Sequence, residues 1–141
     1  VIVTRGNNVY GPHQYPEKAI PKFILRLLRG LPCCVHGAGE ALRNYMHVSD
    51  VVTAFDTILH HGQGFQDYNI GTHFEISMLD VARQLVALVL PRADVDDMVE
   101  HVPDRMLNDM RYSMDNSKLC ALGWKPKKKI CKDKWTVCEE I

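Results

Sequence analysis

The sequence lacks the motifs by which many nucleotide-dependent enzymes and hydrolases are recognised. No Gly-x-Gly-x-x-Gly occurs, because Leu42 stands at the third glycine position after Gly37 and Asp67 stands there after Gly62. None of the five tyrosines is followed four residues later by lysine, and the chain contains neither a Gly-x-Ser-x-Gly nor a P-loop. By itself the chain therefore shows no dinucleotide cradle and no activated nucleophile.

Charge imbalance and long hydrophobic runs are also missing. The 17 acidic and 17 basic residues give a formal net charge of zero, which argues against a nucleic-acid-binding or membrane-surface protein. The longest apolar run, Leu85 to Leu90, is too short to cross a bilayer, and no signal peptide opens the chain. The length of 141 residues and the hydrophobic content of 46% are typical of one globular domain.

Paired metal-ligand spacings are missing although the chain holds seven histidines and five cysteines. The close pair Cys34-x-His36 has no accompanying CxxC or HxxxH, so packed thiols are favoured over a zinc site. An odd number of cysteines, with Cys33 and Cys34 adjacent, favours reduced thiols and a cytoplasmic protein over a disulfide framework. With a neutral total charge, the lysines between 125 and 134 are interpreted as a solvated face.

Hydrophobic periodicity predicts an α/β domain of short strands and helices. A buried strand is expected at 1–3, and further strands are expected at 33–36, 44–48, 67–70 and 99–102. The expected helices run from Pro21 to Gly30, from Ser49 or Asp50 to about Gly62, from Ser77 to Pro91, from Asp115 to Gly123, and over a last segment with Cys131, Trp135 and Cys138 on one seam. The second helix is expected to bury Val51, Val52, Phe55, Ile58 and Leu59.

The segment from Arg5 to Pro21 is predicted to be an irregular polar loop at the end of the first strand. It contains Gly11 and three prolines, which exclude a regular helix or a central strand. Three amides, two tyrosines, an imidazole, a carboxylate and an ammonium lie in it. Loops at the carboxyl ends of strands commonly bind ligands, although an ordinary solvent-exposed connection has the same composition.

Arginines and an asparagine suggest a diphosphate site. Arg43 follows a glycine turn, Asn69 ends a strand, and Arg105 and Arg111 lie in a second irregular stretch. The planar guanidinium binds phosphate oxygens in a bidentate manner, so side chains from separate strand ends could converge on one diphosphate. Each of them alone is more often a partner in a surface salt bridge than a phosphate ligand.

Several segments together resemble the nucleotide-sugar 4,6-dehydratases, which are extended short-chain dehydrogenase/reductases acting on dTDP-glucose or UDP-glucose. The resemblance covers essentially the whole chain and is closest to the eukaryotic-type members. The segments that carry it are Asn8-Val9-Tyr10-Gly11-Pro12, Tyr15-Pro16-Glu17-Lys18-x-Ile20-Pro21, His36-Gly37-x-Gly39, Arg43 to Asp50, Tyr68-Asn69-Ile70-Gly71, Asp104-Arg105, Asn108-Asp109-x-Arg111-Tyr112 and Leu122-Gly123-Trp124-x-Pro126.

The resemblance implies that residues 1–141 are the carboxyl-terminal, substrate-binding portion of such an enzyme. The NAD-binding Rossmann portion, with the glycine-rich loop, the Tyr-x-x-x-Lys pair and the Asp-Glu acid/base pair, would precede Val1. The missing motifs and the abrupt start are then explained by truncation. No catalytic residue is expected in this chain, which alone should be inactive. The complete enzyme would be a lyase that holds NAD, and it is expected to form a homodimer.

The family also implies roles for individual residues. Asn8 would lie where nicotinamide and hexose meet, contacting both cofactor and substrate. The remaining candidate substrate-binding residues fall into four groups: a loop of Glu17, Lys18, Ala19 and Ile20; Cys34 and His36 beside the nucleotide base; Arg43 and Asn69 on the diphosphate; and Asp104, Arg105 and Asn108 over the nucleotide end.

This sequence departs from the family pattern at four positions, three of them among these candidates and one, Met106, next to Arg105. Met106 replaces a proline, Asn108 replaces the histidine of bacterial members, and Cys34 and His36 replace their proline and tyrosine. The choice between thymine and uracil therefore stays open. Two alternatives remain: a nucleotide-sugar epimerase or decarboxylase of the same fold, which the Pro-Glu-Lys-x-Ile-Pro run opposes, and a non-catalytic nucleotide-sugar-binding fragment.

Overall fold

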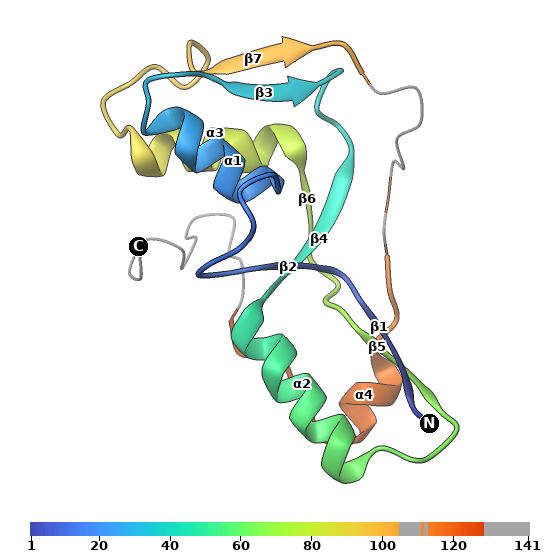
Figure 1. Cartoon of the computed structure of the whole chain (residues 1–141). Coiled ribbons are helices and arrows are strands. Elements are labelled where there is room, and N and C mark those ends of the chain that lie inside the picture. Colours follow the sequence, from blue (N-terminus) through green and yellow to red (C-terminus); the bar gives the residue numbers. More distant parts are fainter. Residues whose placement is uncertain (105–110, 112, 129–141) are drawn as a thin grey trace. The chain divides into compact units, whose positions relative to one another are not determined.

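The computed structural model describes residues 1–104, 111 and 113–128, which divide into two compact units. The first unit contains residues 1–12, 44–75 and those after 112, and the second contains residues 13–43 and 76–111. Figure 1 shows the order of their helices and strands along the chain. The predicted α/β class is confirmed, since helices alternate with short strands that pair in parallel.

The first unit is built on two parallel strand pairs. Strand β1 (Val3–Gly6) pairs with β5 (Asp67–Ile70), and β2 (Asn8–Tyr10) pairs with β4 (Leu42–His47). Strand β4 lies between β2 and β6 (Glu75–Ser77) in its sheet. Helices α2 (Val48–His61) and α4 (Ser117–Ala121) complete the unit. Its buried core consists of Met46, Ala54, Ile58, Tyr68, Ile70, Leu119 and Trp124.

The chain before Pro12 is more regular than its sequence predicts. The strand expected at 1–3 instead spans Val3–Gly6, and Val1 is 92% exposed. The segment predicted as a loop contains the end of β1 and all of β2. These predictions were wrong because the strands are defined by pairing with β5 and β4, which local composition does not reveal. The three prolines all follow β2 and leave its pairing intact.

Helix α2 begins one residue earlier than expected, and its cap is a different residue. His47 is the N-cap, and its Nδ1 accepts a hydrogen bond of 3.2 Å from the backbone N–H of Ser49. The carboxylate of Asp50 is buried and accepts the backbone N–H groups of Lys127 and Lys128 at 3.1 and 2.9 Å. Asp50 therefore holds a segment 77 and 78 residues further along the chain rather than the start of its own helix.

The buried face of α2 also differs from the prediction. Its fully buried residues are Asp50, Ala54 and Ile58, whereas Leu59 is 79% exposed. Val52 and Phe55, which were predicted to be buried, are exposed as well. The small Ala54 permits close packing, so the helix turns this narrow side toward the core and leaves the bulkier apolar flank outside.

The second unit packs two helices beside a parallel strand pair. It contains α1 (Ala19–Leu27), β3 (Cys33–His36), α3 (Met78–Val89) and β7 (Val99–Val102), with β3 pairing with β7. Helices α1 and α3 contact each other, and both contact β3. The predicted strands at 33–36 and 99–102 are confirmed.

The ends of α1 and α3 test the capping predictions. Pro21 is the third residue of α1 rather than the first, because the helix already begins at Ala19. The expected capping box is confirmed: Ser77 Oγ accepts the Asp80 N–H at 3.0 Å and donates to Asp80 Oδ2 at 2.7 Å. In the first unit, the N-cap of α4 is Asn116 rather than the expected Asp115, although Asp115 Oδ1 accepts the Ser117 N–H at 2.9 Å. The last predicted helix, with Cys131, Trp135 and Cys138, lies outside the described residues.

The burial of α2 leads to a direct stability test. Ile58→Ala removes a side chain from the core and should lower the free energy of unfolding by about 2–5 kcal/mol. Leu59→Ala, next along the same helix, should change it by less than about 0.5 kcal/mol because Leu59 is exposed. Urea unfolding of both variants measures the difference. Equal losses in the two variants would mean that Leu59 is buried, as the sequence predicts, and would contradict its exposure in the structure.

Candidate functional site

Asn8 lies in the first unit on the three-residue strand β2. It pairs with Tyr45 of β4, and its Nδ2 donates to the carbonyl oxygen of Asn44 at 3.4 Å. Two residues later the strand ends at Tyr10, and Gly11 follows with a φ of 150°. A Cβ at Gly11 would lie 2.6 Å from Val48 Cγ1, so the chain must have glycine here to pass the first residue of α2.

Asn44 beside it is a buried polar residue that the sequence patterns did not identify. Asn44 is 1% exposed. Its side chain forms hydrogen bonds with Thr72, which lies two residues beyond the end of β5. Asn44 Oδ1 accepts from the Thr72 N–H and Oγ1 at 3.4 and 3.0 Å, and Nδ2 donates to the Thr72 carbonyl oxygen. The sequence gives no clear signal for it, because Asn44 follows the charged Arg43 in a strand of mixed polarity.

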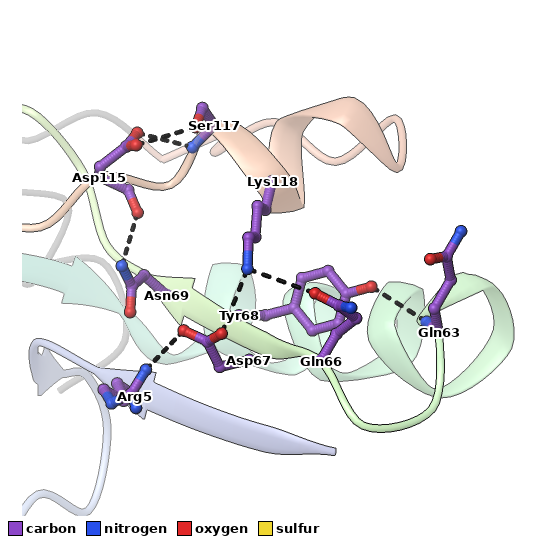
Figure 2. A network of polar contacts seen from close by, with 9 residues as sticks. All are labelled: Arg5, Gln63, Gln66, Asp67, Tyr68, Asn69, Asp115, Ser117 and Lys118. Atoms are coloured by element: carbon purple, nitrogen blue, oxygen red, sulfur yellow. Dashed lines mark hydrogen bonds and ion pairs between the residues drawn. The ribbon is translucent and has the colours of Figure 1, made fainter.

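Asn69, the second candidate in the first unit, lies on β5. Its Nδ2 donates to the backbone oxygen of Asp115 at 2.8 Å, as Figure 2 shows. The Asp115 carboxylate in turn accepts the backbone N–H and the hydroxyl of Ser117, both at 2.9 Å. These two hydrogen bonds lower the pKa of Asp115. Asn69 thus fixes the chain just before α4.

Asp67 lies two residues before Asn69 on β5 and binds two basic side chains from other elements. Asp67 accepts a hydrogen bond of 2.6 Å from Arg5 and one of 3.2 Å from Lys118, both drawn in Figure 2. The hydrogen bond from Arg5 is the main cause of the lowered pKa of Asp67, and that from Lys118 adds to it. All three side chains are about half exposed, so these ion pairs tie β1, β5 and α4 together without a large gain in stability.

Cys34 and His36 lie on β3 in the second unit. Strand alternation turns Cys33 and Val35 into the core and leaves Cys34 and His36 half-buried on the other face. Cys34 Sγ donates to Glu100 Oε2 at 3.6 Å, and Arg26 lies 3.8 Å from the same oxygen. Burial raises the pKa of Cys33 to about 11, so this neighbouring thiol stays protonated, as expected for a packed cysteine.

His36 and Asp104 lie close together at the ends of β3 and β7. His36 Nδ1 is 3.0 Å from the Pro103 carbonyl oxygen, which can only accept, so Nδ1 carries the proton. Gly37 follows His36, and a Cβ at Gly37 would lie 3.0 Å from Asp104 Oδ2. The structure therefore places Cys34 and His36 on one face of β3 and brings Asp104 next to Gly37 at the end of that strand.

Four further candidates precede or open α1. Glu17 and Lys18 are exposed, and the Lys18 N–H donates to the Tyr15 carbonyl oxygen at 3.0 Å to form a turn. Ile20 is 3% exposed and lies in the buried core. Ala19 between them is half-buried. This pattern is compatible with a loop that presents backbone groups and two charged side chains.

Arg43 lies on β4, where its Nη1 donates to the Leu42 carbonyl oxygen at 2.8 Å. It belongs to the second unit, whereas Asn69 belongs to the first, so their convergence on one diphosphate stays a prediction. Arg105 and Asn108 lie outside the described residues. Within the described residues, no three His, Cys, Asp or Glu side chains gather as a metal site, and no helix is long and apolar enough to cross a membrane.

Sequence comparison places the chain in a family. The NAD dependent epimerase/dehydratase family matches residues 1–71, half of the chain. The chain belongs to this family.

Individual relatives are more specific. The chain is 48% identical over 130 residues to the dTDP-D-glucose 4,6-dehydratase of Bos taurus, which covers 90% of this chain and 37% of the relative. It is 48% identical over 124 residues to a trifunctional Arabidopsis thaliana protein whose name begins with UDP-glucose 4,6-dehydratase, which covers 88% of this chain and 18% of that one. The chain thus spans little more than a third of the bovine relative's length.

A solved structure agrees with the sequence relatives. The dTDP-glucose 4,6-dehydratase of Bacillus anthracis in complex with NAD superposes with a TM-score of 0.82 at 37% identity, covering 90% of this chain and 40% of that one. The resemblance to the 4,6-dehydratases and the extended short-chain dehydrogenase/reductase fold are thereby confirmed.

The buried amide of Asn44 provides a test within the site region. Asn44→Ala should lower the free energy of unfolding by about 1–3 kcal/mol, because it leaves the Thr72 backbone groups without their partner. Asn69→Ala is the control: it removes one hydrogen bond from a half-buried amide to backbone and should cost about 1 kcal/mol or less. Thermal unfolding compares the two. A larger loss of stability for Asn69→Ala would show that the hydrogen bonds between Asn44 on β4 and Thr72 beyond β5 are not a main source of stability.

Proposed function

We propose that this chain is the carboxyl-terminal, substrate-binding portion of an NAD-dependent nucleotide-sugar 4,6-dehydratase. The observation that carries the proposal is the 48% identity with the bovine dTDP-D-glucose 4,6-dehydratase over 90% of the chain. The proposed reaction converts dTDP-glucose to dTDP-4-keto-6-deoxyglucose. It oxidises the sugar at C4, eliminates water across C5–C6 and returns the hydride to C6.

The contribution of this portion is positioning. The half-buried Cys34 and His36 on β3, with the exposed Asp104 just beyond β7, form a polar strand end suited to a nucleotide base. The diphosphate is assigned to Arg43 and Asn69, with Arg105 and Asn108 over the nucleotide. Binding energy from these remote groups would hold the sugar C4 in place for reaction. Asn8 and the loop from Glu17 to Ile20 are assigned to the sugar.

In this proposal the residues of this chain contact NAD only at its nicotinamide end, where the sugar would lie. None of the described strands leads through a glycine-rich turn into a helix; β4, for example, runs directly into α2 through His47. The diphosphate of NAD is therefore assigned to the portion outside this chain, and Asn8 is the residue here that would face nicotinamide. When bound, NAD supplies a hydride acceptor and donor, while Asn8 helps orient the sugar beside it.

The nucleotide base is left as thymine or uracil for a chemical reason. The two bases have the same hydrogen-bonding edge and differ in one methyl group, which only an apolar contact can detect. Cys34 and His36 present polar groups, and neutral His36 offers Nε2 as an acceptor because its Nδ1 proton is bonded to Pro103. Such an acceptor can receive the N3–H of either base, so these side chains do not discriminate.

Two other proposals are weaker. An epimerase or decarboxylase of the same fold fits the family but not the names of the relatives at 48% identity or the Pro-Glu-Lys-x-Ile-Pro run. A non-catalytic nucleotide-sugar-binding fragment fits the length of the chain. A cytoplasmic location and a homodimer of the complete enzyme are part of the main proposal and are supported by the odd number of cysteines and by the family.

A chimera tests the main proposal. In it, the matched carboxyl-terminal segment of the bovine enzyme is replaced by this chain. Incubation with dTDP-glucose or UDP-glucose should yield the 4-keto-6-deoxy sugar, detected by mass spectrometry, because this portion would supply the substrate contacts. A chimera that instead forms the 4-epimer would favour the epimerase, and one that folds and binds the nucleotide sugar without turnover would favour the non-catalytic alternative.

The chain alone is expected to form no product. It contains none of the family's catalytic residues, so purified 141-residue protein with NAD and dTDP-glucose should show no 4-keto-6-deoxy sugar above a protein-free control. The same assay with the chimera is the positive control. Product formed by the chain alone would contradict the assignment of the catalytic groups to another segment.

Arg43 can be tested in the same chimera. Arg43→Ala should raise KM by about tenfold or more with a smaller change in kcat, because a charge-assisted contact to the diphosphate is lost. Arg83→Ala is the matched control: Arg83 is an exposed arginine of the same unit that pairs with Asp96, and its loss should leave KM unchanged. An unchanged KM in Arg43→Ala would reject the diphosphate role.

A further inference from the structure

We propose that His47 is a positioning residue that holds the end of β2, and with it Asn8, in register for the sugar. This inference rests on the proposed function, because it concerns the geometry of the sugar-facing strand. Two contacts of the His47 imidazole carry the inference. Its Nδ1 atom caps helix α2, and its ring packs against Tyr10 at the end of β2.

The first contact fixes the protonation of the ring. A backbone N–H can only donate, so the 3.2 Å hydrogen bond from the Ser49 N–H requires Nδ1 of His47 to be without a proton. Ser49 Oγ lies 2.7 Å from the same nitrogen and can donate to it as well. In the neutral ring the proton is therefore on Nε2, and the ring orientation is set by the first turn of α2.

The second contact joins this oriented ring to the end of β2. His47 and Tyr10 are register partners in the parallel pair β2–β4, and their rings meet edge to face with centroids 5.2 Å apart. His47 is buried, at 8% exposure, and Tyr10 is buried at 1%. The ring also lies against Gly11, where a Cβ would be 3.6 Å from His47 Nε2. Both residues at the turn out of β2 thus contact one imidazole.

The shortness of β2 makes this contact necessary. A strand of three residues has few backbone hydrogen bonds with which to define its register. A shift by one residue would turn Asn8 to the opposite face of the sheet. The buried pair Tyr10–His47 opposes such a shift at the strand's end, because Tyr10 would have to leave its packed position. Asn8, two residues away, is held by the same pairing with β4.

The two functions of His47 can be separated by two substitutions. Asparagine is a strong N-cap and keeps an acceptor for the Ser49 N–H, but it lacks the ring. Phenylalanine keeps a ring at Tyr10 but removes the acceptor. Both variants are made in the chimera defined above. The proposal predicts that His47→Asn loosens β2 and leaves the start of α2 intact, and that His47→Phe does the reverse.

Two measurements are made on each variant. In His47→Asn, backbone amide exchange in residues 8–11 should become about tenfold faster while the first turn of α2 keeps its protection. Its kcat should fall about tenfold with KM within about twofold, because a misplaced contact slows the chemical step. In His47→Phe, the exchange of β2 and kcat should stay within about threefold of the unsubstituted chimera, while Tm falls by about 2–4 °C from loss of the cap.

The outcomes separate this proposal from the proposed function. If the unsubstituted chimera shows no turnover, the dehydratase assignment fails, and the exchange measurement still decides the role of His47. If His47→Asn keeps wild-type exchange in residues 8–11 and wild-type kcat, the positioning role is wrong. Equal losses of kcat and Tm in both variants would show that His47 acts only through the stability of the fold, which also overturns the proposal.

Discussion

The first unit depends on buried polar side chains that bond to backbone far away in the sequence. Asn44 on β4 binds Thr72 beyond β5, Asp50 on α2 binds the N–H groups of Lys127 and Lys128, and Asn116 Nδ2 donates to the Gly71 carbonyl oxygen at 2.7 Å. Each of the three polar side chains is 5% exposed or less, and each satisfies groups that would otherwise lose their water partners. Short parallel strands need such ties, because their connections are long and their own ladders are small.

The carboxylate of Asp50 shows how such a tie changes local structure. Next to the start of a helix, an aspartate is by sequence the expected cap, and its side chain would accept an N–H of its own first turn. In the structure both oxygens are instead taken by the distant backbone, and His47 supplies the cap. The local rule failed because a long-range partner offered the carboxylate two N–H donors at once.

The same distinction explains what could be predicted from sequence and what could not. Strands β3, β5 and β7 and the capping box of α3 follow from period and local chemistry, and they were predicted with their correct bounds or nearly so. The strands before Pro12 pair with residues 37 or 64 positions further along the chain, and the buried side of α2 shares its core with residues as distant as Leu119 and Trp124, so local patterns misplaced them. For the candidate site, alternation on β3 predicts that Cys34 and His36 share a face. Their nearness to Asp104 requires the pairing with β7.

Asn69 illustrates that a structural and a binding role can belong to one side chain. Its amide nitrogen carries two hydrogens, and the bond to the Asp115 carbonyl oxygen uses one of them. The second hydrogen is available to a phosphate oxygen, so fixing the chain before α4 does not exclude the assigned diphosphate contact. The bond to Asp115 instead orients the amide plane, which lowers the entropy lost when the second contact forms. Under the proposed function, an amide held in this way would be preorganised for the diphosphate.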